Sequence, residues 1–232
     1  MNTGLTDQFC VAIALDPVVP ATLYLATYGG MFKSTNAGGT WAVIGSGITN
    51  LDVRVVAVDP TTSGTVYVGT NGGGVFKSTN SGAMWAPANG NLTNLRVEAL
   101  AIDPLSPATL YAGTRSEPMS SAGIFKSTSA GADWVAASTG LPPFGSFDAL
   151  VVNPKSSGTL YAAEINAGVF KSTDSGASWV AVNAGLPSAR RYVRALALDP
   201  AGATTVYAGL DHGGVWQATP PMLAERTSDA IE

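Results

Sequence analysis

A six-residue pattern, Gly–apolar–aromatic–Lys–Ser–Thr, recurs along the chain and constrains the fold more than any other feature. It reads GMFKST at 30–35, GVFKST at 74–79, GIFKST at 123–128 and GVFKST at 168–173, with a degenerate copy, GVWQAT, at 214–219. Successive copies lie 44, 49, 45 and 46 residues apart. Self-similarity at a period of roughly 40–50 residues is typical of the blades of a β-propeller.

Two further markers recur in the same order as the hexapeptide. One is Asp-Pro or Asn-Pro, and the other is a Tyr that follows an apolar residue; they fall at Asp16, Asp59, Asp103, Asn153 and Asp199 and at Tyr24, Tyr67, Tyr111, Tyr161 and Tyr207. Short alternating apolar segments between Gly, Pro, Asn and Ser indicate strands and turns. Each unit therefore predicts four strands, the fourth beginning at Trp41, Trp85, Trp134 or Trp179. The expected fold is all-β, a propeller of five four-stranded blades within one domain over residues 1–219.

The turn between the third and fourth strands resembles the Asp-box, Ser-x-Asp/Asn-x-Gly-x-x-Trp. It stands here as STNAGGTW (34–41), STNSGAMW (78–85) and STDSGASW (172–179), while STSAGADW (127–134) carries Ser129 at the Asp/Asn position. Sialidases, xyloglucanases, sortilin-type receptors and photosystem II assembly factors share this repeat (also called BNR). The resemblance implies that the box is a folding device, in which Asn or Asp bonds its own turn, Gly takes a positive φ and Trp packs beneath.

The fifth unit is incomplete, because no box or Trp follows Thr219. We expect the fifth blade to lack a recognisable outer strand. Residues 220–232 form a C-terminal tail that is disordered or supplies that strand around 222–227. A third alternative is that the open outer edge pairs with another chain, since unprotected strand edges invite association.

Composition excludes several classes of function. The net charge of -4 argues against a nucleic-acid partner, because affinity for nucleic acid rests on Lys and Arg contacts to phosphate. No apolar run approaches the roughly 18 residues of a membrane span, so membrane insertion is not expected. Residues 1–9 show no signal peptide; the protein is cytoplasmic, or extracytoplasmic if a leader has been removed. The single Cys10 excludes an intramolecular disulfide, and we expect it to be a small buried side chain.

Charge that the repeat does not require gathers at one end of the expected propeller. Thirteen of the 28 charged residues lie in connections from strand four to the next strand one, or from strand two to strand three. Antiparallel geometry puts both kinds of connection at the same end. The residue five before each Asp or Asn marker should surround the mouth of the central channel: Val11, Arg54, Glu98, Asp148 and Arg194.

Other side chains join this end of the molecule. The second strands end in Glu164, at the place of Thr27, Thr70 and Thr114, and in the pair Asp211 and His212. Tyr28, Phe144, Phe147 and Tyr192 add aromatic surface. Since ligand sites combine a few polar groups with apolar walls on rigidly held loops, we take as ligand-binding candidates Arg54, Glu98, Asp148, Glu164, Tyr192, Arg194, Asp211 and His212.

Catalysis and metal binding have weaker support. A glycosidase needs two carboxylates at a set separation, and Glu98, Asp148 and Glu164 qualify by position alone. Neighbouring arginines would lower carboxylate pKa values and so oppose a general acid. His212 is the only histidine and no ligand cluster has recognisable spacing, so no metal and no cofactor are expected.

Three hypotheses of function follow. The first is a non-catalytic scaffold whose loop-rich face and channel mouth bind a protein segment or a carbohydrate. The second is a glycoside hydrolase or a fragment of one. The third is a structural module that forms homo-oligomers through its incomplete fifth blade.

Overall fold

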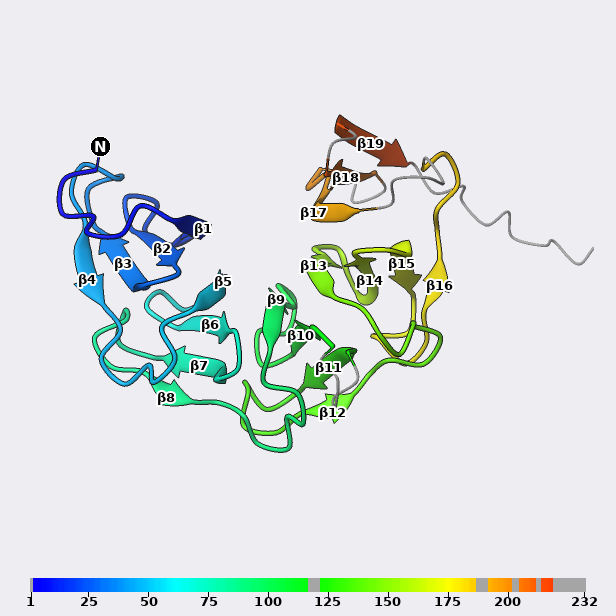
Figure 1. Ribbon diagram of the computed structural model, residues 1–232, viewed down its shortest axis with the longest axis horizontal. Coiled ribbons are helices and arrows are strands. Elements are labelled where there is room, and N and C mark those ends of the chain that lie inside the picture. The colour runs from blue at the N-terminus through cyan, green and yellow to red at the C-terminus, as the bar shows by residue number, and fades with distance from the viewer. Residues whose placement is uncertain (1, 117–121, 187–191, 202–204, 212–213, 219–232) are drawn as a thin grey trace, which may run out of the picture.

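The computed structural model describes residues 2–116, 122–186, 192–201, 205–211 and 214–218. These residues form five antiparallel sheets that follow one another around an arc, each with its first strand on the inner side (Figure 1). The all-β five-blade propeller predicted from the sequence is confirmed. Among the described segments there is no helix long and apolar enough to cross a membrane.

Each of the first four blades is a meander of four strands in chain order. Blade 1 contains β1 (Cys10–Leu15), β2 (Leu23–Thr27), β3 (Gly30–Ser34) and β4 (Ala42–Ile44). Blade 2 contains β5 (Val53–Val58), β6 (Val66–Thr70), β7 (Gly74–Ser78) and β8 (Ala86–Pro87). Blade 3 contains β9 (Val97–Ile102), β10 (Leu110–Thr114), β11 (Ile124–Ser127) and β12 (Val135–Ala136). Blade 4 contains β13 (Phe147–Asn153), β14 (Ser156–Glu164), β15 (Gly168–Ser172) and β16 (Val180–Ala181).

Blade 5 has three strands within the described residues: β17 (Val193–Leu198), β18 (Val206–Leu210) and β19 (Gly214–Ala218). A fourth strand of this blade would follow β19, in residues outside the described ones. The tail, 220–232, lies outside the described residues.

The fourth strands begin one residue later than expected. In blades 2–4 the backbone N–H of the tryptophan that precedes the fourth strand donates to the connection that leaves the preceding blade, as Trp85 does to the Ser46 carbonyl (2.8 Å) and Trp179 to the Thr139 carbonyl (2.9 Å). That N–H therefore makes a hydrogen bond between two blades, and it is not available for a strand hydrogen bond within its own blade.

Neighbouring blades interlock through two unlike faces. The face toward the next blade carries the small residues of the first strand and the Tyr of the second, and the face toward the preceding blade carries Val, Leu and Phe. Between blades 1 and 2, for example, Tyr24 and Ala26 pack against Val56, Val68 and Phe76. Since burial of apolar area is the main favourable term in folding, these interfaces, and not single blades, hold the core.

The Lys of each of the first three repeats fastens its blade to the next one. Its ammonium lies over the Tyr ring of its own blade, at 5.6 Å for Lys126 over Tyr111, and donates to a carbonyl of the next box turn, at 3.1 Å for the Ser175 oxygen. Lys33 and Lys77 make the same contacts, reaching the carbonyls of Ser81 and Ala130. We call this arrangement the Lys–Tyr latch.

The box turns explain why those carbonyls are available. In each box the residue before the Gly also has a positive φ, 59° at Ser81 and 57° at Ser175, and the following Gly has a φ of 84° to 87°. Two successive left-handed residues turn the chain sharply. The Asp/Asn side chain holds the turn: Asp174 accepts from the Ser178 N–H and from the hydroxyls of Ser172 and Ser178, which lowers its pKa to about 2. Ser129 accepts the equivalent N–H, from Asp133, in the third box.

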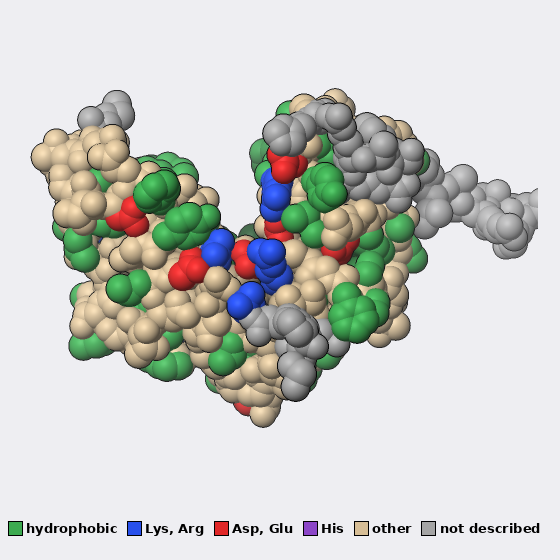
Figure 2. All heavy atoms as spheres, viewed as in Figure 1, with side chains coloured by type: hydrophobic (Ala, Val, Ile, Leu, Met, Phe, Trp, Pro, Cys, Tyr) green, Lys and Arg blue, Asp and Glu red, His purple; other side chains and the backbone are tan. Residues whose placement is uncertain are grey.

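The arc is open between its first and fifth blades (Figures 1 and 2). The exposed fraction of Ile13 is 57% and that of Leu15 is 58%, and at the other end Tyr207 is 38% exposed whereas its four counterparts are at most 2% exposed. The expectation that Cys10 is buried is wrong. Its counterparts in blades 2–5 are fully buried by the preceding blade, and no described blade precedes β1.

The Lys–Tyr latch can be tested by a double-mutant cycle. Lys126→Met should lower the free energy of unfolding by about 1–2 kcal/mol, because the ring loses its cation and the Ser175 carbonyl keeps only one of its two donors, the Tyr111 hydroxyl at 3.2 Å. Combined with Tyr111→Leu, the two losses should be coupled by about 0.5–1 kcal/mol in urea unfolding. Strict additivity would mean that the ammonium is a solvated surface charge.

Candidate functional site

A β-bulge lies at the same place in all five blades, near the start of the innermost strand. The pairing of the first and second strands skips one residue there, so that Val53 and Val55, for example, pair with successive residues and Arg54 is extra. The skipped residues are Val11, Arg54, Glu98, Asp148 and Arg194. A bulge re-aims a side chain and is common next to binding sites. These are the five positions that the sequence analysis found five residues before each Asp or Asn marker, and the bulge is the reason that they stand apart from the ladder.

Arg54 is held between a carboxylate and an aromatic ring. Its Nη2 donates a hydrogen bond to Asp52 Oδ2 at 2.9 Å, and its Nε lies 2.8 Å from Asp52 Oδ1, an ion-pair contact without hydrogen-bond geometry. Its guanidinium carbon is 4.9 Å from the centre of the Tyr28 ring. Sequence reasoning did not select Asp52, although residues two apart on a strand share a face and this spacing could have indicated the pair.

Glu98 is a carboxylate of this site with unused hydrogen-bonding capacity and, unlike Asp52, it has no ion-pair contact among the described residues. The side chain is half-buried at the start of β9, and its Oε1 is buried with no hydrogen-bond partner among the described residues. Burial raises the pKa of Glu98, the charge of Arg54 opposes the shift, and the charge of Asp148 adds to it. A buried acceptor without a partner is costly, so a donor supplied by a ligand would be favourable here.

Asp148, Arg194 and Asp211 form a chain of charges from blade 4 to blade 5. Arg194 Nη1 lies 2.8 Å from Asp148 Oδ2, and Arg194 Nη2 lies 3.5 Å from Asp211 Oδ2. Asp148 also accepts from the Ser146 hydroxyl. The carboxylate is therefore well satisfied, whereas about half of the Arg194 side chain is exposed.

Apolar side chains accompany these charges. Tyr192 is 45% exposed and precedes β17, and Phe144 is 70% exposed in the connection into blade 4. Phe147, which the sequence suggested as a surface aromatic, is fully buried in the core between blades 3 and 4. His212 lies outside the described residues. Figure 2 shows charged side chains of both signs along the inner margin of the arc, with apolar side chains beside them.

We define the rim as the six described candidates on this margin together with Asp52 and Tyr28. Its members are Tyr28, Asp52, Arg54, Glu98, Asp148, Tyr192, Arg194 and Asp211.

Glu164 is fully occupied by the backbone around it. It is 1% exposed, and its two oxygens accept from the N–H groups of Ser146 (3.2 Å), Asn166 (2.8 Å) and Ala167. In blades 1–3 a Thr at this place does part of this work, as Thr70 does by accepting from the Gly73 N–H and donating to the Gly74 carbonyl. Its carboxylate thus shapes the connection between β14 and β15 and is not turned to solvent.

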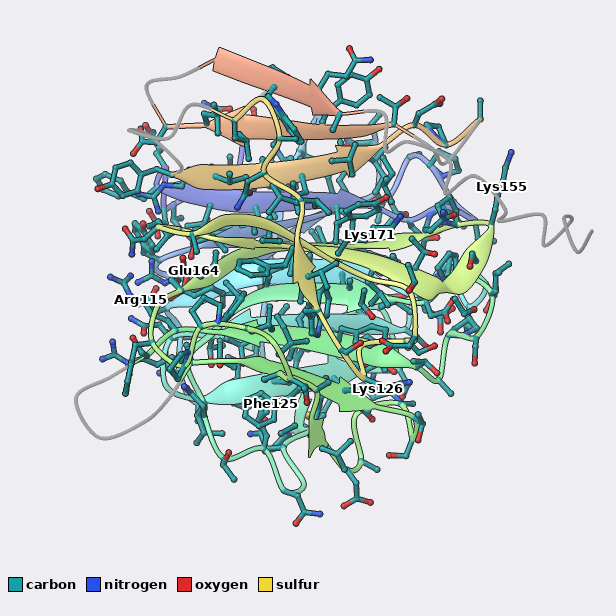
Figure 3. All side chains as sticks on the ribbon, turned by 90° about the vertical axis from the view of Figure 1, so that its right-hand side faces the viewer. Arg115, Phe125, Lys126, Lys155, Glu164 and Lys171 are labelled. Atoms are coloured by element: carbon teal, nitrogen blue, oxygen red, sulfur yellow. The ribbon has the colours of Figure 1, made fainter. Side chains whose placement is uncertain are left out.

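The two ends of the propeller carry different kinds of residues. In the side view, Arg115 and Glu164 lie at one edge, while Lys126, Lys155 and Lys171 lie toward the other (Figure 3). The first edge carries the individual residues and the second carries the repeated turns. Within the described residues there is no group of three His, Cys, Asp or Glu side chains that could hold a metal ion.

Comparison by sequence finds no relative: no protein-family model matches the chain, and no curated protein matches it.

Comparison by structure finds many β-propellers. An ancestral GH74 enzyme is similar with a TM-score of 0.78 and 24% identity, over 94% of this chain and 30% of the enzyme. The GH74 xyloglucanase from Xanthomonas campestris is similar with a TM-score of 0.72 and 19% identity, over 92% of this chain and 36% of the enzyme. YCF48 bound to D1 peptide is similar with a TM-score of 0.63 and 15% identity, over 90% of this chain and 63% of YCF48. The chain thus spans about a third of the length of the GH74 enzymes, and the likeness concerns the fold.

The role of Glu164 can be separated from that of Glu98 by substitution. Glu164→Ala should lower the free energy of unfolding by about 3 kcal/mol, because buried N–H groups lose their acceptor, and Glu164→Gln should cost about half of that. The matched control is Glu98→Gln, which removes a desolvated charge and should change stability by less than about 1 kcal/mol. Equal losses for Glu164→Ala and Glu98→Gln in urea unfolding would contradict this distinction.

Proposed function

We propose that the chain is an Asp-box propeller that acts as a non-catalytic binding scaffold, and that its rim holds an extended segment of another protein. The observation that carries the proposal is the row of bulged positions. Four of the five carry a charged side chain, with the signs +, −, − and + in chain order, on a scaffold that otherwise carries few charges.

The chemistry of the rim suits a polypeptide. Both of its arginines are paired with carboxylates, and its four carboxylates outnumber the arginines, so the rim offers more acceptors than cations. Glu98 has an acceptor to offer, Arg194 has exposed donors, and Tyr28 and Tyr192 offer apolar surface. An extended chain brings backbone N–H and C=O groups and alternating side chains, which match these features. YCF48, similar in fold, has been solved with a peptide, which supports this class of ligand.

A glycoside hydrolase is the alternative, and the GH74 enzymes of similar fold favour it. The carboxylate geometry argues against it. A two-carboxylate mechanism needs an acid with a raised pKa and a second free carboxylate. Glu98 fits the first role, but Asp148 is held by Arg194 and Ser146, and Glu164 is buried against backbone N–H groups.

Binding can be tested with a defined ligand set. We expect the purified chain to bind members of an array of synthetic 15-residue peptides, and to hydrolyse no member of a glycoside panel that includes xyloglucan oligosaccharides. The double variant Arg54→Ala/Arg194→Ala should weaken binding of the selected peptides at least about tenfold, since hot spots are often Arg and aromatic side chains.

Two matched controls decide how the result is interpreted. Lys155→Ala, on the opposite end, should leave peptide affinity unchanged. Turnover of a glycoside that is lost in Glu98→Gln would overturn the non-catalytic assignment. Peptide binding that is unaffected by the double variant would remove the rim as the site.

Assembly through the open arc is a second candidate, favoured by the exposed apolar side chains on blades 1 and 5. The Val–Ile–Leu face of β1 and the Ala–Tyr face of blade 5 are the two kinds of face that meet at every internal interface. Blade 1 of one copy can therefore pack against blade 5 of another, a head-to-tail contact.

Sedimentation velocity tests this assembly. We expect the average mass to rise with protein concentration, and Ile13→Asp to abolish the rise because it places a charge in the apolar contact. Val135→Asp, an exposed position on an outer strand, is the control and should have no effect. A monomer at every concentration would rule the assembly out.

A further inference from the structure

In blades 2, 3 and 4, one polar side chain that follows the fourth strand hydrogen-bonds to backbone groups at the start of the third strand. In blade 2, Asn89 follows β8; its Oδ1 accepts from the Val75 N–H (2.6 Å), and its Nδ2 donates to the Gly73 carbonyl (3.0 Å). The amide side chain thus fills the space above Gly74, where a β-carbon would collide with it. One carboxamide satisfies a backbone donor and a backbone acceptor at once.

The same device recurs in the next two blades. In blade 4, Asn183 accepts from the Val169 N–H (2.8 Å) and donates to the Ala167 carbonyl (2.7 Å). In blade 3, the hydroxyl of Ser138 accepts from the Ile124 N–H and donates to the Ile124 carbonyl, both at 3.0 Å. The position is therefore filled by an amide in two blades and by a hydroxyl in one.

Blade 1 lacks this side chain, because Gly45 stands at the place of Asn89. Gly45 has a φ of 132°, which other residues avoid. In blades 2 and 4 the amide serves a strand N–H and a turn carbonyl. In blade 1 the sheet serves the strand residue, Met31, since β4 continues to Ile44 and pairs it with Met31. The turn carbonyl has no such substitute: among the described hydrogen bonds none reaches the carbonyl of Gly29, which is the counterpart of the Gly73 carbonyl.

A cavity occupies the vacated position. It has a volume of about 480 Å³ and is bounded by the Gly29–Gly30 turn, β4 with Gly45, and the box turn of blade 2. A β-carbon on Gly30 would meet only Leu51 Cδ2, at 3.7 Å, whereas on Gly74 and Gly168 it would meet amide oxygens. The space is therefore open in blade 1 where its counterparts in blades 2 and 4 are filled.

We propose that this cavity is a binding site for a primary carboxamide, such as the side-chain amide of an Asn or Gln residue, supplied from outside the chain. The amide NH₂ donates to the Gly29 carbonyl, as Asn89 donates to Gly73 and Asn183 to Ala167. The body of the ligand packs on the apolar wall formed by Phe32, Val43, Ile44 and Leu51.

The polar lining agrees with a donor and disfavours an anion. Thr6, Ser46 and Asp7 line the cavity beside the Gly29 carbonyl. Asp7 accepts from the N–H groups of Phe9 (2.9 Å) and Gly29 (2.7 Å), and these bonds lower its pKa. The ionised carboxylate repels carboxylate and phosphate ligands, whereas a neutral amide can donate both of its hydrogens.

Amide-detected NMR titration with acetamide and acetone tests the proposal directly. Acetone has nearly the shape of acetamide but no N–H donor. We expect acetamide to shift the amide signals of Gly29, Gly30, Met31 and Gly45 saturably, with a Kd on the order of 10 mM for so small a ligand. Acetone should bind about tenfold more weakly, since it cannot donate to the Gly29 carbonyl. The signals of Gly74 and Gly168, where Asn side chains already fill the space, should not move.

Two variants control the experiment. Leu51→Trp fills the space above Gly30 and should abolish the acetamide shifts, while a substitution on the rim, Arg194→Ala, should leave them intact. The site is thereby distinguished from the proposed peptide site, and either can fail alone. Equal binding of acetamide and acetone, shifts spread evenly over the blades, or shifts that persist in Leu51→Trp would each overturn the proposal.

Discussion

The structure depends on the contact between unlike blade faces. Each interface joins small side chains and a Tyr on one blade to Val, Leu and Phe on the next. In the Lys–Tyr latch, the Lys of one blade donates to the carbonyl of a box-turn residue with positive φ in the next blade, as Lys77 does to Ala130. Because two partners are always needed, a single blade has no complete core. The fold is therefore a chain of interfaces, and its first and last faces remain exposed on Ile13, Leu15 and Tyr207.

This dependence explains how far the sequence could predict the structure. Tyr24 and Lys33 recur because the latch requires them, so the repeat revealed the blades, the order of the strands and the two unlike ends. The burial of Cys10 could not be predicted in the same way. Its counterparts are buried by a preceding blade, and a pattern within one repeat does not say whether a neighbour is there. The outer strands begin after Trp85 and Trp179 because a contact between blades competes for their N–H groups.

In the candidate site, too, the repeat predicted the positions of residues but not their contacts. The bulged residue lies five positions before the Asp-Pro or Asn-Pro marker in every blade. Counting back from the marker therefore identified these positions from the sequence. Counting could not separate a carboxylate with an unused oxygen, Glu98, from one consumed by backbone N–H groups, Glu164. That difference lies in a loop whose conformation the repeat does not determine. The cavity in blade 1 has a similar origin: its signal is Gly45 at the place of Asn89 and Asn183, visible once the structure shows what those side chains do.

The central claim is that a rigid repeated scaffold presents its individual chemistry at one end, on the rim. Hydrogen–deuterium exchange with and without a selected peptide tests it most directly. The account predicts slower exchange upon binding in residues 50–54, 94–98, 145–149 and 192–195, with no change in the box turns at 79–84 and 173–178. Protection confined to the box turns would contradict it.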